Sequence, residues 1–170
     1  MHSARRVLLV VGSIAALTAI AAPAAAQAPT ITEVVGDLDA PRGVAIGADG
    51  TIYVAEAGEG GSDPCVEHPE LGTICFGPTG GISAVTDGVA TRLVDGLAST
   101  VTATGEVIGP SDVTVDADGV VWFLVGGPGA GAADGRAGVP DGAAAGMGQL
   151  YQVDAEGNAR MVAVGAKPIQ

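Results

Sequence analysis

The feature that most constrains this chain is an internal repeat. The stretch PRGVAIGADGTIYVAEAG at residues 41–58 recurs as PSDVTVDADGVVWFLVGG at residues 110–127. In each copy a short apolar run leads into an Asp-Gly pair, at residues 49–50 and 118–119, and a β-branched or aromatic run follows. Asp-Gly between two such runs is typical of a β-hairpin. A repeated hairpin therefore predicts an all-β fold built from repeated units.

Each hairpin is followed by a long insert and then by a second pair of candidate strands, at residues 80–97 and 148–165. A further stretch with the pattern of the closing strand stands alone at residues 31–38. Without the inserts each unit has about 40 residues, which is the size of a four-stranded propeller blade. The sequence thus predicts a β-propeller region with two blades, at residues 41–97 and 110–165.

Two blades cannot close a ring, because propellers typically have about four to eight. We therefore expect the β-propeller region, residues 27–170, to be a fragment of a longer ring. The alternative is that several short chains self-associate to complete one. A lone copy would expose the edges and faces of its terminal sheets.

Connection lengths differ between the two ends of the expected sheets. Short turns are expected at residues 48–50, 86–88 and 155–157. Long connections are expected at residues 58–79, 98–109 and 126–147, as irregular inserts. In a four-stranded blade these two groups lie at opposite ends. Binding residues on rigid scaffolds are commonly carried by long loops, so the end with the long connections is the expected site.

The first 26 residues have the pattern of a secretory signal peptide. Arg5 and Arg6 precede an apolar run at residues 7–22, and three alanines at residues 24–26 follow. The apolar run is shorter than the roughly 20 residues of a membrane span, which makes an anchor the weaker alternative. We expect a secreted or periplasmic protein that does not span a membrane after cleavage. The sequence leaves open whether export is by the Sec or the Tat route.

The chain is strongly acidic, with a formal net charge of -12. Removing the predicted signal peptide takes away two arginines and no acidic residue, so the rest is more acidic still. Nucleic acids and anionic membranes bind cationic surfaces, so both are excluded as expected partners. The charge fits a soluble exported protein, or one with a cationic partner.

Two cysteines, Cys65 and Cys75, lie close together in the first insert. In an oxidising compartment a local disulfide between them is the simplest interpretation. A nucleophilic thiol or a metal pair is less well supported. The spacing is not CxxC, and His68 is the only histidine outside the predicted signal peptide.

These stretches resemble the ScyD/ScyE family of secreted bacterial proteins, named for the scytonemin pigment pathway. The resemblance depends on the repeated hairpin and on the segment PCVEHPELGTICFGPTGGISAV at residues 64–85. Similar hairpins occur in NHL and gluconolactonase-like propellers, so the cysteine segment carries most of the specificity. Membership would imply a six-bladed, TolB-like propeller and an exported protein, with no catalytic residues to carry over.

Three residues are candidates for ligand binding because they belong to variable positions of the repeat or lie beside them. They are Arg42, Glu56 and Asp112, expected near the mouth of a central channel. A polar or cationic ligand would suit them, and the alternative is local pairing of Arg42 with an acid. No cofactor is expected, although acids in the first insert leave an extracellular calcium site as an alternative. The possible calcium ligands are Glu59, Asp63, Glu67 and Glu70.

Two functional classes fit these observations. The first is a non-catalytic exported propeller that binds a small molecule or a protein. The second is a metal-dependent propeller enzyme of the lactonase or lyase type, whose site would need blades that this chain lacks. Gluconolactonase-like metal sites use Asn beside Glu and Asp, and the only asparagine here, Asn158, belongs to a predicted tight turn. The sequence therefore favours the non-catalytic class.

Overall fold

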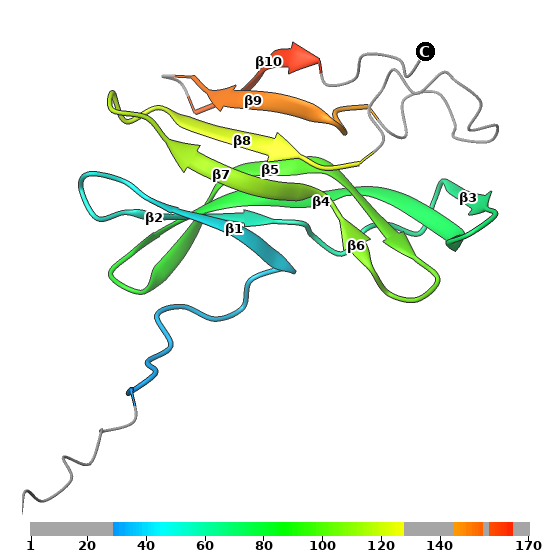
Figure 1. The fold of residues 1–170 in the computed structure, drawn as a ribbon, viewed down its shortest axis with the longest axis horizontal. Helices are drawn as coiled ribbons and strands as arrows, with labels where there is room; N and C mark the ends of the chain where they lie inside the picture. The colour runs from blue at the N-terminus through cyan, green and yellow to red at the C-terminus, as the bar shows by residue number, and fades with distance from the viewer. Residues whose placement is uncertain (1–28, 128–144, 155–156, 165–170) are drawn as a thin grey trace, which may run out of the picture. The chain divides into compact units, whose positions relative to one another are not determined.

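The computed structural model describes residues 29–127, 145–154 and 157–164. The predicted signal peptide, residues 1–26, lies outside these residues. The chain separates into residues 1–32 and a compact unit of residues 33–170, and the ten strands of the described residues lie in the second unit (Figure 1). Strands are the only regular secondary structure of the described residues. None of these residues belongs to a helix that could span a membrane. The all-β prediction is confirmed.

The strands form two antiparallel sheets. The first has the order β1-β2-β4-β5-β6, with β3 paired to β4. Its strands are β1 (Pro41–Ile46), β2 (Ile52–Glu56), β3 (Cys65–His68), β4 (Gly72–Thr86), β5 (Val89–Thr102) and β6 (Val107–Ile108). The second has the order β7-β8-β9-β10. Its strands are β7 (Pro110–Val115), β8 (Val121–Val125), β9 (Gln149–Val153) and β10 (Ala159–Val164).

Each sheet contains a four-stranded antiparallel meander, and the two meanders have the same strand order. In both, the first two strands come from the repeated hairpin, and the next two come from the second expected strand pair. The hairpin registers also correspond, since Val44 pairs with Val54 and Val113 pairs with Phe123. The sequence repeat is therefore a repeat of strand order and register.

Three of the short turns share one geometry. Gly50, Gly119 and Gly157 have positive φ angles of 86°, 81° and 86°. In each turn the N–H group three residues before the glycine donates to the carbonyl of the residue after it. The turn between β4 and β5 is tighter, with Asp87 and Gly88 both at positive φ. Glycine tolerates this backbone conformation without steric cost, which explains the Asp-Gly signal in the sequence.

The difference in turn length changes the register of the last strand. Arg92 on β5 lies opposite Ser83, and its counterpart opposite Tyr151 is Met161. Sequence comparison of the two copies instead aligns Arg92 with Arg160, and the structure shows this alignment to be wrong. Because side chains alternate along a strand, Arg160 belongs to the opposite face.

Two expected features differ in the structure. Residues 31–38, expected as a closing strand, belong to no strand. Residues 58–79 are not an irregular insert, because β3 and the first half of β4 form a hairpin there. Likewise, much of the connection at residues 98–109 is the end of β5 and β6, which pair with each other. The polar and glycine-rich composition hides these strands, which are held by pairing with one another.

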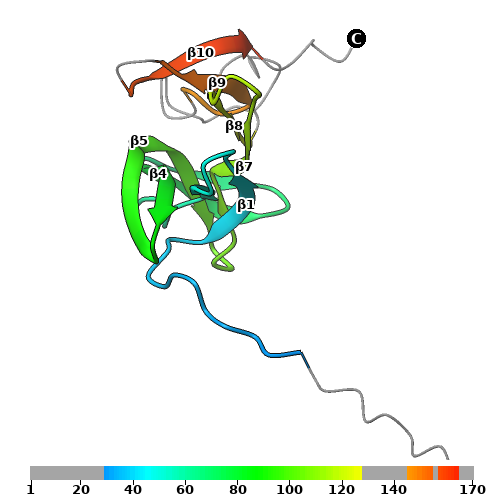
Figure 2. The same cartoon turned by 90° about the vertical axis from the view of Figure 1, so that its left-hand side faces the viewer.

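The core lies between the two sheets. Ala55, Ile82 and Val94 of the first sheet belong to the same buried cluster as Val113 and Phe123 of the second. The closest approach between the sheets is at their first strands, where β7 packs against β1 and β2 (Figure 2). Phe123 also stacks on Tyr151, with ring centroids 5.1 Å apart.

Candidate functional site

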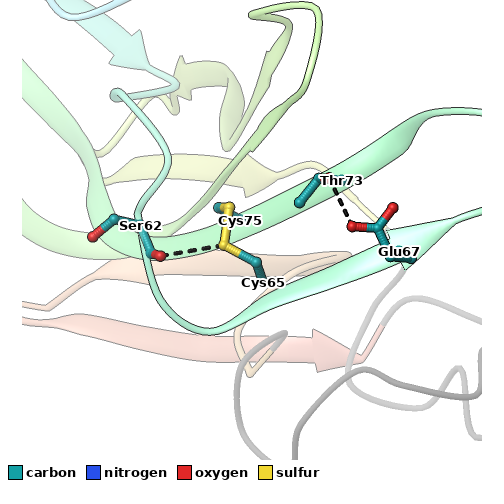
Figure 3. Close-up of a disulfide and its surroundings, with 5 residues drawn as sticks. All are labelled: Ser62, Cys65, Glu67, Thr73 and Cys75. Carbon is teal, nitrogen blue, oxygen red and sulfur yellow. Dashed lines mark hydrogen bonds between the residues drawn. A yellow bond between two sulfur atoms is a disulfide. The ribbon is translucent and has the colours of Figure 1, made fainter.

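The end of the first sheet that carries the long connections is built by an extension of β4 and β5. Beyond the meander these two strands continue between β3 and β6, so the local strand order is β3-β4-β5-β6. Cys65 and Cys75 lie opposite each other in the β3–β4 hairpin and are joined by a disulfide (Figure 3). Thr73 donates to Glu67 across the same two strands, at 2.7 Å. A disulfide is typical of proteins in an oxidising compartment.

The segment that leaves β2 is fixed against this extension. The buried Ser99 hydroxyl donates to the Ala57 carbonyl at 2.6 Å and accepts from the Gly60 N–H at 3.0 Å. Thr79 donates to the Gly60 carbonyl at 2.8 Å. Gly61 lies directly against the backbone of Phe76, where a Cβ atom would not fit. These contacts position the extension on the rigid meander.

A groove of about 250 Å³ lies beside the disulfide hairpin. Its walls include Asp63, Pro64, Phe76, Pro78 and Ala98. The side chains named here are apolar except for the Asp63 carboxylate, and backbone groups of Gly77 and Gly96 also line the groove. The volume is slightly below the range of about 300–1,000 Å³ that is common for small-molecule sites. It suits a compact ligand, or one part of a larger ligand.

The structure brings two of the three predicted ligand residues to neighbouring strands. Arg42 is exposed on β1, and its Nη2 donates to the Val107 carbonyl at 2.8 Å. Asp112 is exposed on β7, and its Oδ1 accepts from the Val113 N–H at 2.9 Å. The strands approach closely there, because a Cβ atom built on Gly43 would lie 2.6 Å from the Cα of Asp112. Both charged groups remain accessible to solvent.

Glu56 has a different environment from the one expected. Its side chain is 1% exposed, and Oε1 accepts from Arg92 Nη1 at 2.8 Å and from the Ser83 hydroxyl. Oε2 accepts from the backbone N–H of Asp39 at 2.7 Å. Both oxygens are thus bound by protein groups, and the carboxylate is not open to a ligand. The expectation that Glu56 contacts a ligand is corrected by this burial.

The alternative expected for Arg42 was an ion pair with an acid, but among the described residues it is Arg92 that pairs with a buried acid, Glu56. Arg92 also contacts Asp39 Oδ2 at 3.1 Å, so it joins the segment that precedes β1 to β5. Arg92 and Asp39 are 53 residues apart, and no local spacing in the sequence connects them. The repeat gave no signal either, because the second sheet has Val125 and Met161 at the positions of Glu56 and Arg92.

The acids considered as calcium ligands are not brought together in one cluster by the described structure. In the described part of the chain, no three His, Cys, Asp or Glu side chains come together closely enough to hold a metal ion. This applies to Glu59, Asp63, Glu67 and Glu70, all of which are described. Glu67 is instead used by Thr73 in the disulfide hairpin.

Acids in the short turns at the opposite end stabilise those turns. The Trp122 indole N–H donates to Asp116 Oδ2 at 2.9 Å, and this bond, with further backbone N–H donors, holds the pKa of Asp116 below 3.8. The pKa of Asp49 is lowered chiefly by the N–H of Thr51. Burial raises the pKa of Tyr151, whose hydroxyl donates to the Gly146 carbonyl. None of these groups lies in the groove.

No protein-family model matches this chain, and no curated protein matches it. Among solved structures, the chain is similar to a crystal structure from Thermus thermophilus described as an oxidoreductase of the glucose dehydrogenase type. The identity is 15% and the TM-score 0.34, over 75% of this chain and 48% of that one. The chain thus spans about half the length of this neighbour.

Proposed function

We propose that this chain is a non-catalytic, exported binding scaffold of the β-propeller type, similar to the ScyD/ScyE proteins, and that its two meanders are blades of a larger ring. The ligand is a small molecule or a protein that binds at the end carrying the long connections. The predicted signal peptide and the disulfide support export to the periplasm or the medium.

The observation that carries this proposal is the repeated meander, with short turns at one end of the sheets and long connections at the other. Both copies have the strand order that a propeller blade requires, and their short turns carry Asp-Gly or Glu-Gly pairs. The disulfide hairpin and the groove are built from the long connections. A rigid frame with elaborated connections at one end is a common arrangement of binding proteins.

The charges near β1 and β7 indicate the ligand chemistry. Arg42 offers a planar group of hydrogen-bond donors, and Asp112 offers an acceptor, on strands that pack against each other. The protein as a whole is acidic, with a net charge of -12. A polar ligand with both donors and acceptors, or a cation, is therefore favoured over an anion.

Thermal unfolding with and without candidate ligands tests the binding role. Spermidine serves as the cationic probe and a sugar lactone as the neutral polar probe. A ligand present at about 100 times its Kd would stabilise the fold by about 2.7 kcal/mol. We expect one of these probes to raise the Tm, and the double variant Arg42→Ala, Asp112→Ala to lose that rise.

The matched control is the double variant Arg160→Ala, Asp118→Ala. It removes the same two charges at exposed positions away from the proposed site. If neither probe raises the Tm, or if both double variants lose the same rise, the binding role proposed for Arg42 and Asp112 is wrong. Export is tested separately, by the recovery of a processed product beginning near Gln27.

A further inference from the structure

The groove beside the disulfide hairpin has features of a ligand site that Arg42 and Asp112 do not account for. All of its described lining residues lie between β2 and β9, in the extension of β4 and β5 or in segments that flank it. Neither Arg42 nor Asp112 is among these residues. The groove is therefore a separate surface at the end of the sheets that carries the long connections.

Two of the segments that line the groove are tied directly to each other. Residues 63–64 come just before Cys65, and residues 76–78 follow Cys75 without a gap. The disulfide joins the two cysteines, and the Phe76 N–H donates to the Pro64 carbonyl at 2.9 Å. A covalent bond and a hydrogen bond thus fix the width of the groove. A site formed in advance loses less conformational entropy when a ligand binds.

The apolar residues of the groove lie at different depths. Phe76 is 4% exposed, which places it at the bottom, whereas Pro64 and Ala98 are half-buried and Pro78 is exposed at the rim. A compact apolar body could therefore pack on Phe76 between the other three side chains. The removal of its surface from water would supply the hydrophobic part of the binding free energy.

Asp63 carries the single charge among the described lining residues. Its side chain is exposed, and within the described ranges no N–H group, hydroxyl or arginine contacts its carboxylate. Glu56 and Glu67 differ in this respect, because Arg92 and Thr73 bind their carboxylates. The Asp63 carboxylate is therefore available to a ligand. It favours a cation, as does the net charge of -12 of the whole chain.

We propose that this groove binds a compact organic cation. Its apolar body packs on Phe76, Pro64 and Ala98, and its protonated amino group pairs with the Asp63 carboxylate at the rim. The groove volume of about 250 Å³ suits one small molecule of this kind. The inference deepens the proposed binding role and rests on it for the end of the sheets at which a ligand binds. It names other contact residues and a ligand class.

The test uses the full chain, with benzylammonium as the probe and benzyl alcohol as its neutral counterpart of similar shape. Amide chemical shifts of the isotope-labelled chain, followed during titration, give both the affinity and the place of binding. We expect the largest shifts at Gly77, Gly96 and Ala98. Benzylammonium should bind at least about threefold more tightly than benzyl alcohol, because only the amine can pair with Asp63.

The variant Asp63→Asn should lower the benzylammonium affinity by at least about threefold and leave the benzyl alcohol affinity unchanged. The matched control is Glu70→Gln, which removes one negative charge from the exposed turn of the same hairpin. Glu70 is not among the described lining residues of the groove. The control should leave both affinities unchanged, and circular dichroism reports whether each variant is folded.

Three results would overturn the proposal: shifts spread over the acidic surface, equal affinities for the two probes, or equal losses in Asp63→Asn and Glu70→Gln. Benzylammonium that shifts the amides of β1 and β7 instead would overturn it too, but would leave the binding role of Arg42 and Asp112 intact. Shifts confined to the groove would support the groove, even where no rise in Tm depends on Arg42 and Asp112. The two proposals can therefore fail separately.

Discussion

The ion pair between Glu56 and Arg92 leads to a prediction about stability. Glu56 is 1% exposed, whereas the Arg92 side chain is 30% exposed and has further carboxylates nearby. Substituting Arg92→Met removes the cation and leaves a buried carboxylate with only the Ser83 hydroxyl and the Asp39 N–H. Removing one partner of a fully buried ion pair costs about 3–5 kcal/mol. Because water can reach Arg92, we expect a smaller loss of about 2–3 kcal/mol.

The same substitution should cost less when Glu56 carries no charge. In the Glu56→Gln background the side-chain oxygen can still accept from Ser83 or Asp39, and no buried charge remains. Arg92→Met then removes only an ordinary hydrogen bond, worth about 0.5–1.5 kcal/mol. The difference between the two costs, about 1.5 kcal/mol, is the coupling energy of the pair.

Urea unfolding of the wild-type chain, the two single variants and the double variant measures this coupling. Far-UV circular dichroism reports on the strands of both sheets. A coupling energy below about 0.5 kcal/mol would refute the reasoning, since it would mean that Glu56 is stabilised without Arg92. An Arg160→Met variant controls for the loss of an exposed arginine elsewhere.

Two further predictions concern the two ends of the sheets. Asp116 has a pKa below 3.8 in the folded chain, so its contribution to stability is present above the unfolded pKa and is lost as the pH falls through the lower folded value. The fluorescence of the only tryptophan should therefore change with a midpoint below the ordinary pKa of an aspartate, and Asp116→Asn should abolish that change. A midpoint at or above that ordinary value would contradict the prediction. At the other end, the double variant Cys65→Ser, Cys75→Ser should lose up to about 3 kcal/mol, because the disulfide restrains the unfolded chain. Limited proteolysis should then cut first within residues 58–79, and cleavage elsewhere at the same rate would argue against a local role.

The repeated meander could be predicted from the sequence because its signals are local. Asp-Gly pairs flanked by β-branched residues specify the hairpins, and the structure has both hairpins, with corresponding registers. The strand β3 could not be predicted in this way. Its residues, CVEH at 65–68, are half polar, and they are held by pairing with β4 and by the disulfide. Such pairing becomes visible only when the chain is folded.

The candidate site could be predicted only in part, for a similar reason. Arg42 and Asp112 were predicted because they differ between otherwise matching copies, and the structure brings their strands together. Glu56 was assigned to the same site because it lies at the end of the same hairpin. Its actual partner, Arg92, lies two strands further along the chain, and pattern alone does not connect them.

The extra residue in the turn between β9 and β10 has a broader consequence. It shifts β10 by one position, so that Arg160 and Met161 exchange sides relative to the first sheet. A single inserted residue in a connection can thus exchange the side chains on the two faces of a whole edge strand, although the strand's own residues are unchanged. Two repeats of similar sequence can in this way present different side chains on the same face, because their turns differ in length by one residue.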